Sequence, residues 1–322
     1  MSRTLRLIFL LVGVAIVALM VWQAGPAALW AGLRRSLWVV LALIPLWAAV
    51  YVLNAIAWQR LTSEGGENIP LLAAFRMTVV AFAVNYSTPL ASFGGEPLKI
   101  AAATKALGKR RAVGSVVAFR LLHALAHVVA WLIALIPAAM LLPKTPMILG
   151  GIIGVGVALT IATVFLFSRH REGMAIQLLE ILRKTPLLKR LAVKLEPKAA
   201  ALHEIDGHVT AIYVQNPRRF YAALGYEMVA RLLALAEYWI ILWGMGLGVD
   251  PWKAFVVGSF SSLVVNILIF MPFELGSKEL ALVSMFKWIG ITPALGLEVA
   301  ALSRLRELVW IAFGWAMIWT MR

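Results

Sequence analysis

Apolar residues gather along this chain in stretches long enough to cross a bilayer core, which takes about 20 residues of helix. Six stretches predict full membrane spans: residues 7–22, 38–58, 113–142, 147–167, 220–245 and 300–319. The first follows Arg3 and Arg6, as in a signal peptide, but it is long and no clean small-x-small cleavage site follows it. We therefore expect a membrane anchor there, in an all-α integral membrane protein.

Two further apolar stretches, residues 71–93 and 254–273, run into segments that mix charged residues with glycine and proline. These segments read NYSTPLASFGGEPLK and MPFELGSKE, and ionisable groups at bilayer depth are costly and usually functional. If residues 71–93 crossed completely, Lys99 and the basic residues from Lys105 to Arg111 would lie outside, against the positive-inside rule. We therefore predict re-entrant hairpins at about residues 71–107 and 254–290, with tips that line a watery cavity.

The chain then divides into two halves, residues 1–145 and 146–322, each with three full spans and one hairpin. Because three is odd, the second half starts on the opposite face of the membrane. This predicts inverted-topology repeats within one membrane domain. Such repeats place substrate sites near the bilayer midplane, where broken helices aim their ends at the ligand.

Composition supports this class, since 62% of the residues are hydrophobic and 14% are charged. The formal charge of +15 predicts cytoplasmic loops that face anionic lipid headgroups, and its dispersal between apolar stretches argues against nucleic-acid binding. We expect an inner-membrane protein with both termini cytoplasmic. The polar segment 169–219 then also lies inside, as an amphipathic interfacial helix or an ordinary connector. Arg34 and Arg35 would lie outside, against the charge rule.

Glu96 is the first candidate site residue. It follows Gly94 and Gly95 and precedes Pro97, a pattern that starts a helix whose amide groups suit a phosphate. Glu96 itself would suit an ammonium headgroup or a proton. The alternative is that it only neutralises Arg120 inside the protein.

Arg120, His123 and His127 share one face of the following helix, at i, i+3 and i+7. The guanidinium of Arg120 matches a phosphodiester. The two histidines have the spacing of metal ligands, but no third ligand accompanies them. We therefore expect no metal or other cofactor, and we predict cross-helix hydrogen bonds or a proton role for the histidines.

The second half repeats this order, because Glu279 follows Gly276, and Arg304 and Glu307 stand at i and i+3 on the last span. Residues 96 and 120 are 24 positions apart, and residues 279 and 304 are 25 apart. The match favours one shared central site, which also includes Lys99, over separate structural ion pairs. Other polar hairpin residues could contact a headgroup, although we favour a backbone role for each: Asn85, Ser87, Thr88, Ser92, Ser259, Ser261, Ser262 and Asn266.

These residues resemble the transmembrane, flippase-like region of the lysylphosphatidylglycerol synthase family, the membrane half of the bacterial multiple peptide resistance factor. The resemblance rests on TPLASFGGEPLK, on Arg120, on ELGSKE and on Arg304 in SRLRELVWIAFG, and it covers nearly the whole chain. It implies translocation or binding of lipids, with Glu96, Arg120, Glu279 and Arg304 as the carried-over positions.

The chain departs from that family in two respects. An acidic residue commonly lies near the first helix arginine, where this sequence has Phe119 and His123. The aminoacyl transferase domain of the full synthase is not expected after the last span, so we expect no lipid aminoacylation.

We therefore expect a lipid flippase and not an enzyme. Its substrate would be a polar-headed lipid, which the resemblance widens to a phospholipid, an aminoacylated phospholipid, a hopanoid or a glycolipid. Glu96, Glu279 and His123 are candidate proton carriers, since the sequence has no nucleotide-binding loop. Two alternatives stay open: an ion- or proton-coupled transporter of a small solute, and a non-catalytic subunit of a lipid-modifying pathway. The sequence also allows a homo-oligomer.

Overall fold

The computed structural model describes residues 3–62, 68–87, 94–169, 216–269 and 271–320, together with residues 196 and 207, and its regular elements in these ranges are all helices. They are α1 (Arg3–Ala24), α2 (Pro26–Ser36), α3 (Val39–Thr62), α4 (Leu71–Ser87), α5 (Glu96–Leu107), α6 (Lys109–Leu141), α7 (Pro146–Arg169), α11 (Pro217–Gly244), α12 (Pro251–Ile267), η3 (Pro272–Glu274), α13 (Ser277–Trp288) and α14 (Leu295–Trp319). The all-α prediction is confirmed. Most of the predicted amphipathic segment 169–219 lies outside the described residues.

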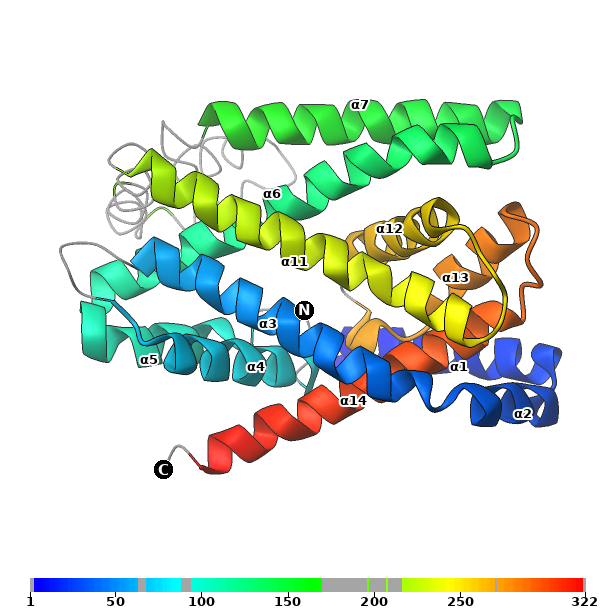
Figure 1. Cartoon of the computed structure of the whole chain (residues 1–322), viewed down its shortest axis with the longest axis horizontal. Coiled ribbons are helices and arrows are strands. Elements are labelled where there is room, and N and C mark those ends of the chain that lie inside the picture. Colours follow the sequence, from blue (N-terminus) through cyan, green and yellow to red (C-terminus); the bar gives the residue numbers. More distant parts are fainter. Residues whose placement is uncertain are drawn as a thin grey trace.

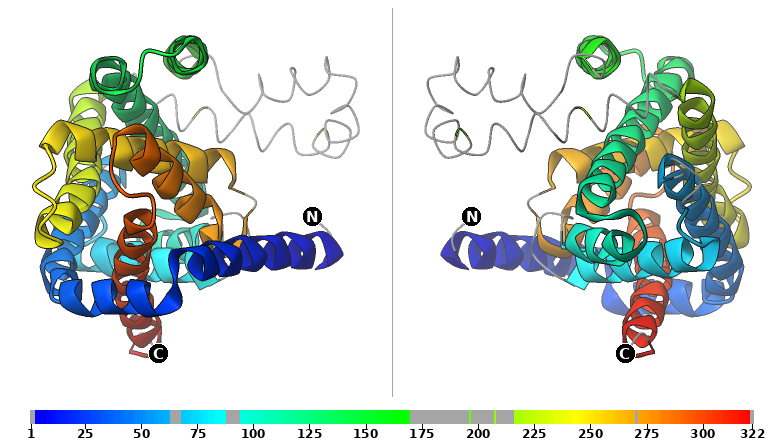
Figure 2. Two further views of the ribbon diagram at one scale, coloured as in Figure 1. Left: turned by 90° about the vertical axis from the view of Figure 1, so that its right-hand side faces the viewer. Right: turned by 90° about the vertical axis from the view of Figure 1, so that its left-hand side faces the viewer.

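Each of the six predicted spans coincides with one helix, but their number as full crossings is not confirmed. Among the described helices, α3, α6 and residues 146–164 of α7 have the length and apolar composition of a span. A fourth would be the α1–α2 pair, which bends by 91° at Gly25, so that α1 projects from the bundle (Figure 2). Helices α11 and α14 are long enough, but both carry buried charged residues such as Glu237 and Arg306.

Helices α4 and α5 fold back on each other, and so do α12 and α13 (Figure 1). In both hairpins the first helix has 17 residues and the second has 12. The α4–α5 hairpin is joined to α3 and α6 at one end of the bundle, whereas the α12–α13 hairpin is joined to α11 and α14 at the other end (Figure 1). The two hairpins therefore enter the bundle from opposite ends.

The helix contacts of the first half have counterparts in the second half. In this comparison α3, α4, α5 and α6 correspond to α11, α12, α13 and α14. Helix α3 packs on α4 as α11 packs on α12, and α5 packs on α6 as α13 packs on α14. Between the halves, α14 packs on α4 as α6 packs on α12. The most extensive contact joins α3 and α11, which are corresponding helices of the two halves.

The apolar core has two main parts, which lie toward opposite ends of α3 and α11. One contains Leu43 of α3 and Ile241 of α11, and the other contains Trp58 of α3 and Phe220 of α11. Between these positions α11 carries Glu227, Arg231 and Glu237. The charged residues are therefore held at mid-length of the bundle, between two apolar layers.

Two glycines are required where the second helix of each hairpin begins. Gly95 lies so close to α4 that an added Cβ would come within 2.5 Å of the Ala81 Cα atom. Gly276 has a φ of +81°, which lies in the left-handed region that favours glycine. Both residues hold the start of a short helix, α5 or α13, at the tip of its hairpin.

Candidate functional site

Glu96 and Arg120 form an ion pair in the first half. Glu96 is the first residue of α5, and its Oε1 lies 2.7 Å from Nε of Arg120 in α6. Next to it, the backbone N–H of Gly95 donates to Oδ1 of Asn85 at 2.7 Å. Asn85 thus has the backbone role that we favoured, and Glu96 does neutralise Arg120. Gly94 lies just before this turn and is half-buried.

The same arrangement occurs in the second half. Nε of Arg304 in α14 lies 2.6 Å from Oε1 of Glu279 in α13, while Oε2 of Glu279 accepts from the N–H of Gly276 at 2.9 Å. The Nη atoms of Arg304 donate to the backbone carbonyl groups of Phe273 and Glu274 at 3.0 and 3.2 Å. These two residues are in the left-handed region, with φ of 56° and 55°, which is strained for side chains of their size. Arg304 therefore holds a strained tip in place.

A direct contact joins the tips of the two hairpins. The Tyr86 hydroxyl at the end of α4 donates to Oε1 of Glu274 at 2.9 Å. Nζ of Lys278 lies 3.1 Å from the other oxygen of Glu274 and also forms an ion pair with Glu307 of α14. Glu307, which we predicted as a site residue, therefore belongs to a buried network that includes a residue of the first hairpin.

Lys99 differs from the other charged residues predicted for the site. Within the described residues, its ammonium group contacts aromatic rings and forms no ion pair with a carboxylate. Its side chain is buried, and Nζ lies 4.4 Å from the ring centre of Phe119 and 5.0 Å from that of Trp58. Cation–π attraction of this kind is strongest in desolvated sites. Lys99 therefore adds positive charge close to the Glu96–Arg120 pair.

Two buried carboxylates of α11 were not among the predicted site residues. Glu227 lies 2.6 Å from Nδ1 of His123 and accepts from Nδ2 of Asn54, also at 2.6 Å. It supplies, from another helix, the acidic partner that the residues around Arg120 lack. The signal was present in the sequence, since ionisable residues inside a predicted span are rarely without function.

Glu237 is the second of these carboxylates. It binds Arg306 through both oxygens at 2.9 and 3.0 Å, and it also accepts from Ser303 and from the indole N–H of Trp47. Arg306 also lies close to the carboxylate of Glu307. Nη2 of Arg306 lies 3.5 Å from Oε1 of Glu307. Helix α14 is covered on several sides, by α3, α4, α11 and α13, so neighbouring residues of α14 are buried together.

Another charged residue of α11, the partly buried Arg231, links the two halves. Nη1 of Arg231 lies 2.7 Å from Nε2 of His127, and Nη2 donates to Ser262 of α12 at 2.7 Å. Nδ1 of His127 faces the backbone oxygen of His123 at 2.9 Å, which can only accept. His127 therefore carries its proton on Nδ1 and accepts from Arg231 through Nε2, so this histidine is neutral. The described residues contain no group of three metal-ligating side chains.

The arrangement combines two partly buried Glu–Arg pairs at hairpin tips, a bridge between the tips, and the buried Lys99 near the first pair. Buried ion pairs are poor stabilisers, because desolvation offsets most of their attraction. Inside a membrane they usually mark a pathway for ions or substrates. A group with phosphate oxygens could take the place of Glu96 or Glu279 beside the arginines. An ammonium group could take the place of the arginines beside the carboxylates.

Two similarities to known proteins extend over nearly the whole chain. Residues 7–314 match the family described as "Lysylphosphatidylglycerol synthase TM region". The chain is also similar to a UPF0104 membrane protein of Pyrococcus horikoshii, at 20% identity over 309 residues, which cover 93% of this chain and 92% of that protein. No solved structure matches.

Proposed function

Because the chain belongs to the lysylphosphatidylglycerol synthase TM-region family, a family of membrane proteins linked to lipids, we propose that it moves a polar-headed lipid from one leaflet of the cell's inner membrane to the other. It would do so without changing the lipid chemically. The observation that carries this proposal is the pair of matched ion pairs, Glu96–Arg120 and Glu279–Arg304, at the tips of hairpins that enter from opposite ends.

The matched hairpins support inverted-topology repeats. Equal helix lengths of 17 and 12 residues, and helix contacts that occur in exchangeable pairs, are what a two-fold axis in the membrane plane would produce. In that arrangement the α4–α5 and α12–α13 hairpins are re-entrant and do not cross the membrane. Their tips then lie near the midplane, where Tyr86 contacts Glu274.

The charges of the site support a headgroup as the transported group. The phosphate of a headgroup would take the place of Glu96 beside Arg120, or of Glu279 beside Arg304, so a charge would never be left alone in the membrane. The acyl tails would stay in the bilayer. Rocking of one half against the other would expose the tip region first to one leaflet and then to the other.

The network also contains groups that could couple transport to a proton. His123 pairs with Glu227, and Glu96 and Glu279 lie at the tips. A proton on any of these carboxylates would release its basic partner for a phosphate. A proton gradient, the membrane potential or later use of the lipid would then drive the direction of movement.

The proposal is tested with the full chain reconstituted in liposomes that contain a panel of fluorescent lipids, whose access to an external quencher is followed with time. We expect wild-type protein to speed exchange between leaflets for at least one lipid, and Glu96→Gln or Glu279→Gln to slow it. Glu298→Gln is the matched control, because this carboxylate lies at the start of α14, outside the ion-pair network of the tips. Equal exchange with wild-type and Glu96→Gln protein would contradict a role for Glu96, and no exchange of any lipid would contradict the proposal.

A further inference from the structure

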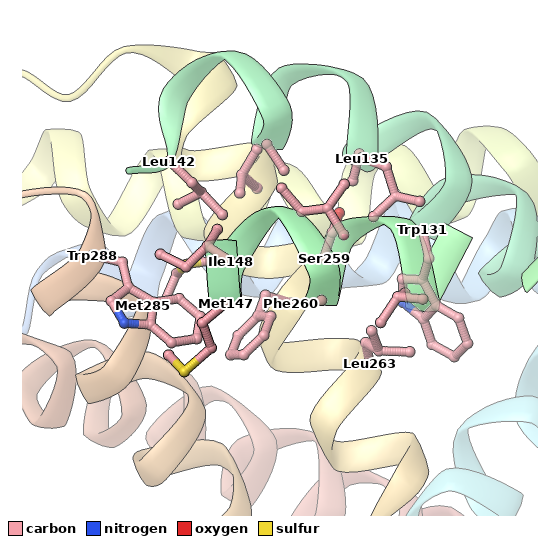
Figure 3. Close-up of a pocket in the computed structure, with 16 residues that line it drawn as sticks. Trp131, Leu135, Leu142, Met147, Ile148, Ser259, Phe260, Leu263, Met285 and Trp288 are labelled. Carbon is pink, nitrogen blue, oxygen red and sulfur yellow. The ribbon is translucent and has the colours of Figure 1, made fainter. Parts of the chain in front are cut away.

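An apolar cavity lies between α6, α7, α12 and α13 (Figure 3). Its volume is about 220 Å³, and most of its wall is made of aliphatic and aromatic side chains, among them Trp131, Leu135, Phe260, Leu263, Met285 and Trp288. Protein interiors are close-packed, and an empty space of this size loses the dispersion contacts that its wall would otherwise make. The cavity is therefore suited to an apolar occupant.

One wall of the cavity faces the place where lipid would lie. Helix α7 packs on α6 along one side, and only 6% of its apolar span is buried (Figure 1). The α7 residues Ile153 and Ile161 are 65% and 64% exposed. A chain from the surrounding bilayer can therefore reach the cavity past a single, lightly packed helix. Gly151 of α7 lines the cavity, and an added Cβ there would meet nothing within 4 Å.

A hydroxyl group without a partner points to the class of the occupant. Ser259 of α12 lines the cavity, is 3% exposed, and its Oγ has no hydrogen-bond partner among the described residues. A buried hydroxyl that is left unsatisfied is costly, so an acceptor is expected from the occupant. In Figure 3 Ser259 lies toward Trp131 and Leu263, while Leu142 and Trp288 mark the other, wholly apolar end.

A partly buried cation, Arg231, lies just beyond the Trp131 end. The indole N–H of Trp131 donates to Oγ of Ser262 at 3.3 Å, and the same oxygen accepts from Arg231. Within the described part of the chain Arg231 contacts neutral His127 and Ser262 but no carboxylate, and its Nε is buried without a partner. This guanidinium therefore has a hydrogen-bond donor left unused, and phosphate is the anion that its fork fits best.

We infer that this cavity holds one acyl chain of a glycerophospholipid, whose ester carbonyl accepts from Ser259 and whose phosphate binds Arg231. Ser259 and Ser262 are three positions apart on α12, so they share one helix face, in the order in which ester and phosphate follow the acyl chain. The inference deepens the proposed function, on which it rests, by assigning a tail-binding slot apart from the two Glu–Arg pairs.

The slot is tested with full-length protein in liposomes that contain a trace of phosphatidylglycerol with a diazirine on its acyl chain. After irradiation, we expect adducts on cavity residues such as Phe260 and Trp288. Gly151→Leu should reduce these adducts to the level found on the outer face of α7. Gly150→Leu should leave them unchanged, because Gly150 lies on the same helix, also has open space at its Cβ, and does not line the cavity.

Two comparisons test the polar contacts. Arg231→Gln should lower labelling by phosphatidylglycerol about tenfold, as expected for loss of a hydrogen-bonded charge, but not labelling by a diacylglycerol with the same diazirine chain. Ser259→Ala should weaken labelling by an ester-linked chain but not by an ether-linked one. Equal labelling of Gly151→Leu and Gly150→Leu protein overturns the slot, and equal labelling by the two probes in wild-type protein overturns the role of Arg231.

The same liposomes separate this inference from the proposed function. If lipid exchange between leaflets proceeds while cavity residues are never labelled, the slot is wrong and the flippase proposal stands. If the cavity is labelled as described while no lipid is exchanged, the slot stands as a binding site and the flippase proposal fails.

Discussion

Tyr86 and Glu274 are 188 positions apart in the chain, yet the Tyr86 hydroxyl donates to Oε1 of Glu274 at 2.9 Å. Tyr86 lies in the last turn of the first helix of one hairpin, and Glu274 lies in the tip of the other. Because Glu274 also pairs with Lys278, this one hydrogen bond connects the first hairpin to the Lys278–Glu307 pair. The two hairpins are therefore joined by a polar contact that motion between the halves has to break or carry along.

Removing this contact should loosen the two tips. We expect Tyr86→Phe to lower the free energy of unfolding by about 1.5–3 kcal/mol, the range for hydrogen bonds to charged groups. Thermal unfolding in detergent measures the loss. The matched control is Tyr221→Phe, since Tyr221 is 60% exposed on α11 and should tolerate the change. Equal melting of the two variants would show that the tip contact adds no stability.

The Glu237–Arg306 pair should behave as a buried ion pair whose partners depend on each other. Both side chains are buried, and the guanidinium lies 3.7 Å from the ring centre of Trp47. We expect Glu237→Leu or Arg306→Met alone to cost about 3–5 kcal/mol, because each leaves one charge buried without its partner.

The double variant Glu237→Leu with Arg306→Met should recover most of that loss, because apolar residues of similar volume can replace a buried pair. Unfolding free energies of the two single variants and the double variant form the required cycle. Additive losses in the double variant would mean that the pair is not coupled. Lipid exchange by a stable double variant would then show whether the charges are needed for transport as well.

The close approach of Gly95 to Ala81 should make α5 intolerant of any side chain at its start. We expect Gly95→Ala to destabilise the protein, because a Cβ would clash with the backbone of α4 and displace Glu96 from Arg120. Gly225→Ala in α11 is the control. A Cβ there meets nothing within 4 Å, so the change should be neutral or stabilising by about 0.5–1 kcal/mol. Lipid exchange and thermal unfolding of both variants test the difference.

Much of this arrangement could be predicted from sequence, because its signals are local. Charged and helix-breaking residues interrupt two apolar stretches, and the structure has a helical hairpin at each. The Glu96–Arg120 and Glu279–Arg304 pairs follow from similar spacings on matched elements, and both are formed. Whether these pairs share one substrate site stays a prediction.

The partners supplied by α11 could not be assigned in the same way. Glu227, Arg231 and Glu237 lie inside a stretch that is apolar enough to be predicted as a span, and nothing local indicates which helix each side chain faces. Their partners come from α3, α6, α12 and α14, at separations set by helix packing. Only the rule that intramembrane charges need partners could have marked them in advance.

Hairpins of equal length and exchangeable helix contacts have a consequence for the conformational cycle. If each half can adopt the shape that the other half has, exchanging the two shapes generates a second conformation that opens to the opposite leaflet. The two end states then have the same fold with the shapes of its two halves exchanged, and they are nearly equal in energy. By itself such a protein would only equilibrate its lipid between the two leaflets, and a proton gradient, the membrane potential or later use of the lipid would set the direction.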